Sequence, residues 1–424
     1  MQQLSRRLQE TELTANIFNL DNGLTLIHQY LPATPVVVSD IWVQAGAIAE
    51  PDAWSGMAHF LEHMIFKGSP RVRVGEFDWV VENRGGIANA ATSHDYAHFY
   101  LTTAANHIEE TLPYLADILL HATIPDEEFI RERDVVLEEI RSSYDDPDWV
   151  AFQTLCQTLY QQHPYKRPIL GEVELLMKHT PNMMRCFHRT HYQPENMTVV
   201  LVGGIEQESA LSLVNQTFGE FSVRSECPPN IVNAEPPLIG IRREELHLSR
   251  IEHGRLLMGW NCPGADYLET AVGLDLLSVI LAGGRCSRLV QELREEKHLA
   301  LDICSEFSLQ KDSSLFTISV WLDGENLDIV ENLICDRLYQ LQTTPITETE
   351  LNRAKKLLLN DYIFSTETPA QLAGIYGYYN IISNLEECLL YPQLVNNISS
   401  SQLERFANLY LSPERYASVR LKPC

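Results

Sequence analysis

The chain has 424 residues, of which 45% are hydrophobic and 21% charged, and its 57 acidic and 32 basic residues give a formal net charge of −25. These proportions are ordinary for a globular protein and exclude disordered, collagen-like and coiled-coil chains. No apolar run approaches the length of a membrane span. So large an acidic excess argues against nucleic acid as a partner, because the phosphate backbone would repel the chain.

The N-terminal segment, MQQLSRRLQETELT, has no apolar stretch and no small-residue cleavage site. It therefore predicts no secretory signal, and its two glutamates argue against a mitochondrial targeting segment. The nine cysteines are an odd number with no closely spaced pair, which is typical of reduced thiols. Together these features predict a cytoplasmic protein.

The first half of the chain alternates strand and helix patterns. Residues 15–30 carry an Asp-Asn-Gly turn between two β-rich runs, which indicates a hairpin. Residues 35–46 and 96–104 resemble strands, and residues with helical periodicity follow or separate them, at 54–66, 107–122 and 125–144. Hairpins followed by pairs of helices predict an α+β domain with a largely antiparallel sheet.

A proline-rich segment lies near the middle of the chain. Residues 225–240, SECPPNIVNAEPPLIG, contain four prolines, a composition typical of linkers. We therefore predict a first domain at 1–224, a linker at 225–240 and a second domain at 241–424.

The two predicted domains repeat one pattern. Three segments of the first domain each match a segment of the second, and the matching pairs begin at Ile124 and Ile346, at Phe187 and Phe406, and at Asn106 and Glu325. The distance along the chain between the two members is nearly the same for all three pairs. Three matches in one order at nearly one spacing predict two homologous domains in tandem.

The motif HFLEH, residues 59–63, is the strongest chemical signal in the sequence. On a helix, residues four apart lie on one face, so His59 and His63 can bind one metal ion, with Glu62 beside them. Two imidazoles at this spacing suit zinc, and a glutamate near the metal can take a proton from water. The order H-x-x-E-H is the inverzincin motif.

A catalytic zinc needs a third protein ligand, and the predicted helix 125–144 offers two candidates. Glu132 and Glu139 lie about 20° apart around the helix axis, within the apolar face, whereas Glu138 falls on the solvated face. A carboxylate on a buried face is costly unless it is paired or binds a metal. This pattern favours Glu132 and Glu139 over Glu138.

The second predicted domain has lost these residues. When Ile346 is aligned with Ile124, Ala354 takes the place of Glu132 and Asp361 that of Glu139, and residues 241–424 contain no H-x-x-E-H. The duplicated fold therefore carries one predicted metal site, which binds one Zn²⁺ per chain.

The segment GMAHFLEHMIFKGS, followed further along the chain by Glu139, resembles the pitrilysin (insulinase) family of zinc peptidases. The length is similar to that of its short branch, which includes mitochondrial processing peptidase and bacterial zinc proteases. The resemblance implies His59, His63 and Glu139 as zinc ligands and Glu62 as the catalytic base. It implies Glu132 as a carboxylate that acts just outside the ligands.

The resemblance also implies how substrate binds. The segment GGIANAATSHDYAHFY matches the family's edge strand, so Asn89, Ala90 and Ala91 are expected to pair with the substrate backbone. The implied fold is two homologous α/β domains that close over an internal chamber. The implied activity is hydrolysis of peptides or unfolded segments, including presequence-like ones.

One position departs from the family pattern. The family's second domain carries an arginine and, seven residues later, a tyrosine that help to bind substrate; here Arg294 is followed by Leu301. Leucine cannot donate a hydrogen bond to a developing oxyanion. The sequence therefore resembles the zinc-bearing chain of a heterodimer, whose homologous partner supplies the Arg/Tyr pair, with a homodimer as the other arrangement.

Two functions from other classes remain open on the sequence alone. One is a non-catalytic scaffold subunit of a larger complex, and the other is a peptide-binding clamp with a structural metal. Zinc content tests the first, and the role of Glu62 tests the second. Four other histidines, His94, His98, His107 and His121, lack the spacing of metal ligands and are expected at the surface or in the core.

Overall fold

The computed structural model describes residues 15–424, whose contacts divide the chain into two compact units. Of the described residues, the first unit contains 15–140, 169–231 and 365–389, and the second contains 141–168, 232–364 and 390–424. The N-terminal segment 1–14, on which the targeting prediction rests, lies outside the described residues. Among the described helices, none has both the length and the apolar character that a membrane crossing requires.

The first unit is built on a six-stranded sheet in the order β1-β2-β6-β3-β5-β4. Its strands are β1 (Asn16–Asn19), β2 (Thr25–Tyr30), β3 (Val36–Val43), β4 (Ile87–Thr92), β5 (Ala97–Ala104) and β6 (Met197–Gly203). Neighbouring strands are antiparallel except β2 and β6, which are parallel. Strand β4 lies at one edge of this sheet, so one side of its backbone is available for pairing.

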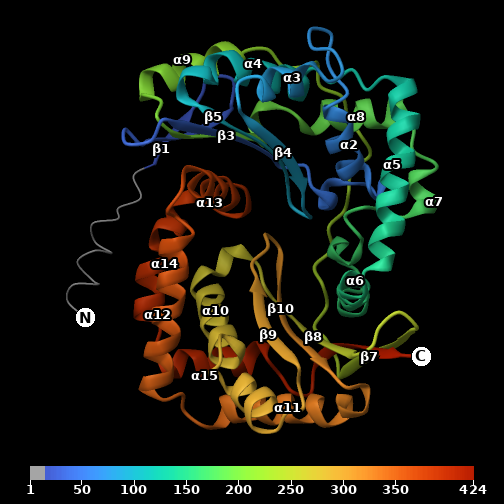
Figure 1. Cartoon of the computed structure of the whole chain (residues 1–424), viewed down its shortest axis with the longest axis vertical. Coiled ribbons are helices and arrows are strands. Elements are labelled where there is room, and N and C mark those ends of the chain that lie inside the picture. The colour runs from blue at the N-terminus through green and yellow to red at the C-terminus, as the bar shows by residue number, and fades with distance from the viewer. Residues whose placement is uncertain (1–14) are drawn as a thin grey trace. The chain divides into compact units, whose positions relative to one another are not determined.

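Helices cover both faces of the first sheet (Figure 1). The helices assigned wholly or mainly to this unit are α2 (Met57–Ile65), α3 (Glu76–Glu82), α4 (Ile108–Leu120), α5 (Asp126–Asp145), α7 (Val173–Leu176), α8 (Pro181–His191), α9 (Gln207–Thr217) and α13 (Pro369–Ile382). Helix α4 packs against β5 and α9 against β2, and the buried apolar residues between helices and sheet form one core. Helix α13 lies on the opposite face, against β3 and β6.

The second unit repeats this plan with five strands in the order β7-β11-β8-β10-β9. They are β7 (Ile241–Leu248), β8 (Gly254–Pro263), β9 (Asp302–Ser308), β10 (Ser313–Leu322) and β11 (Tyr416–Pro423). Its helices are α6 (Pro147–Leu159), α10 (Leu268–Ala282), α11 (Leu327–Thr343), α12 (Glu348–Phe364), most of α14 (Leu385–Asn397) and α15 (Ser400–Tyr410). Only β7 and β11 are parallel, as β2 and β6 are in the first sheet.

This architecture confirms the predicted α+β class and the duplication. Helix α4 corresponds to α11, α5 to α12 and β6 to β11, and the starts of these pairs are separated by nearly the same length of chain, as the sequence matches predict. The predicted hairpin, strands and helices of the first half are also confirmed, with ends that shift by a few residues. Residues 225–239 contain no helix or strand, in keeping with a linker.

The sequence did not indicate that the repeats exchange one helix. Helices α6 and α13 begin at Pro147 and Pro369, which are equivalent places in the repeat, yet α6 belongs to the second unit and α13 to the first. Helix α6 packs against β8 and β11, just as α13 packs against β3 and β6. The compact units therefore differ from the predicted bounds 1–224 and 241–424, which remain a prediction about the repeat.

Glycine permits both of these helix–sheet contacts. A Cβ on Gly377 of α13 would lie 2.0 Å from the indole nitrogen of Trp42, and a Cβ on Gly259 of β8 would lie 2.8 Å from Leu155 of α6. Real Cβ atoms do not approach other atoms so closely, so α13 could not pack as it does with a larger residue at 377, whereas at 259 the end of the Leu155 side chain would have to shift.

Candidate metal centre

Helix α2 presents His59, Glu62 and His63 from a fixed position. Its apolar residues are fully buried, and it begins at Gly56 in a left-handed conformation with φ of 87°. Glu50, which has no exposed surface, accepts hydrogen bonds from the amides of Gly56 and Ala58 at 3.0 and 2.7 Å. A buried carboxylate at this end satisfies free amides and complements the positive end of the helix dipole.

Helix α5 brings two glutamates to this face of α2. Glu139 Oε2 lies 3.6 Å from His59 Nε2 and 3.4 Å from His63 Nε2, while Glu132 Oε1 lies 3.0 Å from His63 Nδ1. Glu138 is exposed, as the helix phase predicts. The side chain of Glu139 is still 43% exposed, so it lies at the rim of the buried stripe rather than in its middle.

The three residues His59, His63 and Glu139 fit a zinc ion. One potential ligand atom from each lies within 4.8 Å of the others. Ligand atoms about 2.0–2.1 Å from a tetrahedral zinc lie about 3.3–3.4 Å apart. The separations of 3.4 and 3.6 Å at Glu139 are close to that value. Two imidazoles and one carboxylate also form a ligand set typical of catalytic zinc, with a fourth position left for water or substrate.

The protonation of the two histidines differs. Burial disfavours a charge on His63, but hydrogen bonds to Glu132 and Glu139 outweigh burial and raise its pKa to about 9. Burial and the neighbouring His63 lower the pKa of His59 to about 4. Without a metal the cluster therefore holds a proton on His63 at neutral pH, and zinc would compete with that proton.

Glu132 lies beside the candidate ligands and contacts one of them, His63. It binds His63 Nδ1, which leaves Nε2 turned towards Glu139 and His59. Lys67 Nζ lies 2.6 Å from the other oxygen of Glu132. Burial alone would raise the pKa of Glu132, but hydrogen bonds from His63 and Lys67 outweigh it and lower that pKa. Sequence reasoning missed Lys67, although its position one helical turn after His63 was a usable signal.

Glu62 is held apart from the ligand set. Its carboxylate accepts a hydrogen bond from the hydroxyl of Thr92 at the end of β4, and it is not among the three residues grouped as metal ligands. Burial raises the pKa of Glu62, partly offset by that hydrogen bond. A raised pKa suits a group that must accept and return a proton near neutral pH. Thr92 was also missed, because only the fold places it beside α2.

The predicted substrate strand is β4 at the sheet edge. Asn89 and Ala91 are exposed and Ala90 is half-buried. The amide of Ala90 donates to the side chain of its neighbour Asn89 at 2.9 Å. This amide is therefore not used in the ladder with β5, and a peptide carbonyl could replace the asparagine oxygen.

Arg294 and Leu301 lie in the second unit. Arg294, in the π-helical segment Val290–Glu296, donates to Glu295 at 3.1 Å and to Asp302 at 3.4 Å. Leu301 has 51% of its surface exposed and carries no side-chain donor. Its backbone amide donates to Trp321.

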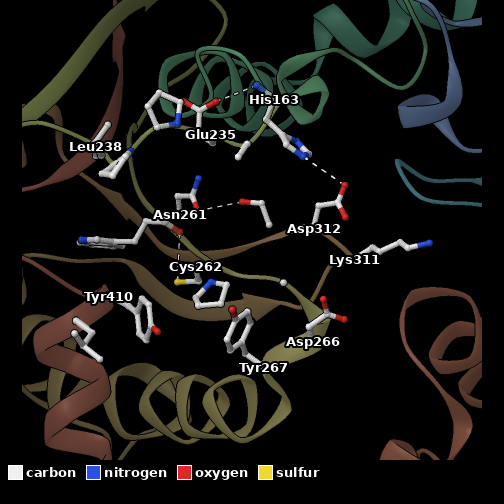
Figure 2. A pocket seen from close by; sticks show the side chains of 18 of the residues that line it. His163, Glu235, Leu238, Asn261, Cys262, Asp266, Tyr267, Lys311, Asp312 and Tyr410 are labelled. Atoms are coloured by element: carbon white, nitrogen blue, oxygen red, sulfur yellow. Dashed lines mark hydrogen bonds and ion pairs between the residues drawn. The ribbon is translucent and has the colours of Figure 1, made fainter. Parts of the chain in front are cut away.

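The second unit also contains a pocket of about 660 Å³ (Figure 2). His163 and Asp312 approach to 3.7 Å on one side, and Asn261 lies across from them. Glu235 of the linker accepts hydrogen bonds from the three consecutive amides of residues 161–163, at 2.7–3.0 Å, which fixes the linker to this unit. None of the residues predicted for the active site lines this pocket.

Two family descriptions match most of the chain. Residues 25–173 match the insulinase family (peptidase family M16), and residues 178–358 match the peptidase M16 inactive domain. The "inactive" description falls on the half that lacks H-x-x-E-H.

Individual relatives match over nearly their whole length. A zinc protease of Mycobacterium bovis is 30% identical, over 95% of this chain and 92% of its own. The zinc protease PqqE of Helicobacter pylori is 28% identical, over 95% of this chain and 92% of its own. The crystal structure of a protease from Helicobacter pylori matches with a TM-score of 0.91 at 28% identity, over 97% of this chain and 99% of that one. The chain therefore belongs to the insulinase family of peptidases, M16.

Proposed function

We propose that this protein is a zinc-dependent endopeptidase that hydrolyses extended or unfolded polypeptide segments. The observation that carries the proposal is the convergence of His59, His63 and Glu139 beside a glutamate that is held off the metal position. A purely structural zinc site needs no such carboxylate, whereas hydrolysis needs a base beside the metal.

Each residue of the centre has one task in this proposal. His59, His63 and Glu139 would hold the zinc ion, which when bound supplies a Lewis acid that polarises the scissile carbonyl and acidifies water. Glu62 takes the proton of the attacking water and later gives it to the leaving nitrogen. Glu132 keeps the ring of His63 oriented through Nδ1.

Strand β4 would bind the substrate backbone. Its free edge accepts an added strand, and the amide of Ala90 can exchange Asn89 for a substrate carbonyl. Main-chain pairing gives little dependence on the substrate's sequence, but it requires an extended chain. Folded proteins would therefore be poor substrates, and unfolded segments good ones.

Three substitutions of glutamate to glutamine test these roles together. Glu62→Gln should keep one zinc per chain and lose hydrolysis of an unstructured peptide by at least about 10²-fold. Glu139→Gln should lose zinc, and Glu138→Gln, its exposed neighbour, should change neither zinc content nor rate. Zinc is measured by elemental analysis after gel filtration, and hydrolysis by mass spectrometry of the products.

Other outcomes identify the two rival functions. A chain that binds no zinc and cleaves nothing would be the scaffold subunit, and a chain that binds zinc and peptide but cleaves nothing, even with a homologous chain, would be the clamp. If the Glu62→Gln variant keeps zinc and cleaves peptides as fast as the unchanged chain, the role of Glu62 as the base is contradicted.

We also propose that full activity requires a second, homologous chain. Support comes from Leu301, which stands where the family carries a tyrosine and offers no donor to an oxyanion. Arg294 is meanwhile paired with two carboxylates of its own unit. An oxyanion donor is worth about 10²–10³ in rate.

The test compares the lone zinc-loaded chain with a mixture. The second component is an M16 chain from the same source that lacks H-x-x-E-H but has the Arg/Tyr pair. We expect the mixture to cleave an unstructured peptide about 10²–10³ times faster than the lone chain, and Leu301→Tyr to recover part of that gain. Full activity of the lone chain, unchanged by mixing, would overturn the split site and leave zinc hydrolysis in place.

A further inference from the structure

Two rows of side chains cross the first sheet on the face turned away from α2. The pairing of β4, β5 and β3 sets these rows, since residues directly opposite one another share a face. From the edge inwards, one row is Ala91, His98 and Trp42, and the other is Asn89, Tyr100 and Asp40. Each row begins with a small residue at the edge and continues to a large ring on the next strand.

His98 contacts one side chain of each row. Its Nδ1 lies 3.0 Å from Asp40 Oδ1, and its ring stacks on Trp42 with centroids 4.3 Å apart and an interplanar angle of 27°. Asp40 has only 5% of its side chain exposed, whereas His98 keeps 18%. A histidine fixed by a buried carboxylate and an indole, yet open to solvent, resembles a recognition group more than a packing residue.

Trp42 is itself locked in place by α13. Gly377 of that helix approaches the indole so closely that no other residue would fit, and Tyr96 packs on the indole at 4.6 Å between centroids. The ring of His98 therefore stacks on an indole that is itself packed between α13 and Tyr96. Because Nδ1 of His98 is engaged by Asp40, Nε2 is the ring nitrogen that is left for another partner.

We infer that His98 is a specificity-determining residue, which accepts a hydrogen bond from a substrate side chain that passes over Ala91. The inference rests on the proposed function, since it takes the substrate strand to pair with β4. A neutral imidazole that donates Nδ1–H to a carboxylate presents Nε2 as an acceptor. The preferred substrate is a polypeptide with a long side chain that ends in a donor at this one position.

The spacing of strands sets the length that the substrate side chain must have to reach His98. An added strand would lie about 4.8 Å from β4 and about 9.6 Å from β5, which carries His98. Alanine at position 91 leaves the way clear for a side chain that lies flat over the sheet. Tyrosine, lysine, arginine or glutamine can span this gap, whereas serine and valine fall short. A long apolar side chain would reach His98 but leave Nε2 without its partner in a dehydrated site.

Peptide binding to the Glu62→Gln variant tests the inference without hydrolysis. The probes are ten-residue alanine-based peptides in which one residue is moved along the chain, measured by fluorescence polarisation. Tyrosine is compared with phenylalanine, and lysine with norleucine, because each pair differs only in the terminal donor. At one position we expect the donor-bearing peptide of each pair to bind about tenfold more tightly.

Variants then assign the preference to His98. His98→Val should abolish it, because valine fits a strand but has no acceptor, while Tyr100→Phe in the neighbouring row should retain it. If His98→Val does not fold, the inference is still tested by the two pairs of peptides, because their binding is compared on the protein that keeps His98. Equal binding within both pairs at every position, a preference for lysine alone, or a preference that survives His98→Val would each overturn it. Selective binding without cleavage by the zinc-loaded chain, both alone and mixed with the homologous chain, would overturn the proposed hydrolysis and leave this inference intact.

Discussion

Lys67 shows how one residue can support the metal centre without touching it. Its ammonium group lies 2.6 Å from Glu132, which in turn binds His63. We predict that Lys67→Met, which keeps the length but not the charge, weakens zinc binding by about 10–100-fold, the usual effect of removing an outer partner. The measurement is the zinc dissociation constant from competition with a chelator.

Two companion variants make that prediction specific. Lys178→Met removes an exposed lysine and should leave zinc affinity unchanged. Lys67→Arg, which keeps the charge, should recover most of the affinity. An unchanged affinity in Lys67→Met would show that Glu132 orients His63 unaided.

Sequence reasoning found the residues of the centre whose signal is local. The spacing of His59 and His63 and the helix phase of Glu139 each depend on one helix alone, so periodicity could detect them. The place of Lys67 four residues after His63 is a local signal that was overlooked, whereas Thr92 acts through a contact with another element, which no local pattern reveals. Glu50 was missed for a related reason, since it caps α2 from a loop that precedes the helix.

Strand β4 offers a test of substrate pairing at the scale of an element. The amide of Ala90 points to the side chain of Asn89 and not into the ladder, so the amides of alternate residues face β5. We predict that Ala90→Pro leaves the fold intact, because proline removes no ladder hydrogen bond there. The same variant should weaken binding of an unstructured peptide to the Glu62→Gln protein by at least tenfold.

Ala91→Pro is the matched control for that variant. Its amide faces β5, so proline at 91 removes a ladder bond and should destabilise the protein by about 1–3 kcal/mol. Thermal unfolding separates the two variants, and peptide binding is then measured on Ala90→Pro. Unimpaired peptide binding by a folded Ala90→Pro protein would show that substrate does not pair with this edge.

A half-buried carboxylate links stability to pH where α10 meets α14. Burial raises the pKa of Asp275 from its ordinary 3.8 to about 7, although the hydroxyl of Tyr391 donates to it at 2.9 Å. The folded chain thus holds this proton more tightly than the unfolded chain. Its contribution to stability is present below about pH 4 and is lost as pH rises to about 7.

Asp275→Asn should remove the loss of stability that accompanies ionisation of Asp275. The amide keeps an acceptor for Tyr391 and cannot ionise, so we predict a higher melting temperature than the unchanged protein at pH 8 and a smaller difference at pH 5. Asp266→Asn, at an exposed position, should show the same difference at both values. A gain for Asp275→Asn that does not grow with pH would show that Asp275 is already ionised in the folded chain.

Most elements followed from periodicity and turn residues, but the exchange of α6 and α13 did not. Both helices have proline in the first turn and apolar residues that pack on a sheet, and these features identify a helix without naming its sheet. Which sheet a helix covers depends on tertiary contacts such as that of Gly377 with Trp42. A single sequence carries no local signal of that choice.

For the whole molecule, the exchange predicts how the chain behaves when it is divided. If the linker is cut at residue 228 and the fragments are produced together, we expect them to elute as one complex. The first fragment carries α6, which packs on the sheet of the second unit. The second fragment carries α13, which packs on the sheet of the first unit. Either fragment produced alone should aggregate, since one sheet face would expose its apolar residues.

Substitution of one glycine tests whether the packing of α13 on the first sheet holds the two fragments together. Gly377→Leu should weaken the complex of fragments, because its side chain would occupy the space of Trp42. Gly374→Leu on the same helix should not, because a Cβ at that position meets nothing within 4 Å. Size-exclusion chromatography and titration of one labelled fragment measure the association. Fragments that fold and remain soluble separately would contradict the prediction.

The exchanged helices also bear on the ancestry of the chain. A gene with a single repeat would encode a protein whose helix could not cover its own sheet in this way, so two copies would have to lend that helix to each other. A swapped homodimer of such single repeats, made covalent by gene fusion, would have the helix assignment of the present chain. In such a fused chain one copy alone would need a metal site: Ala354, fully buried, stands where Glu132 stands in the first repeat, so a methyl group occupies a place where an unpaired carboxylate would be costly to bury.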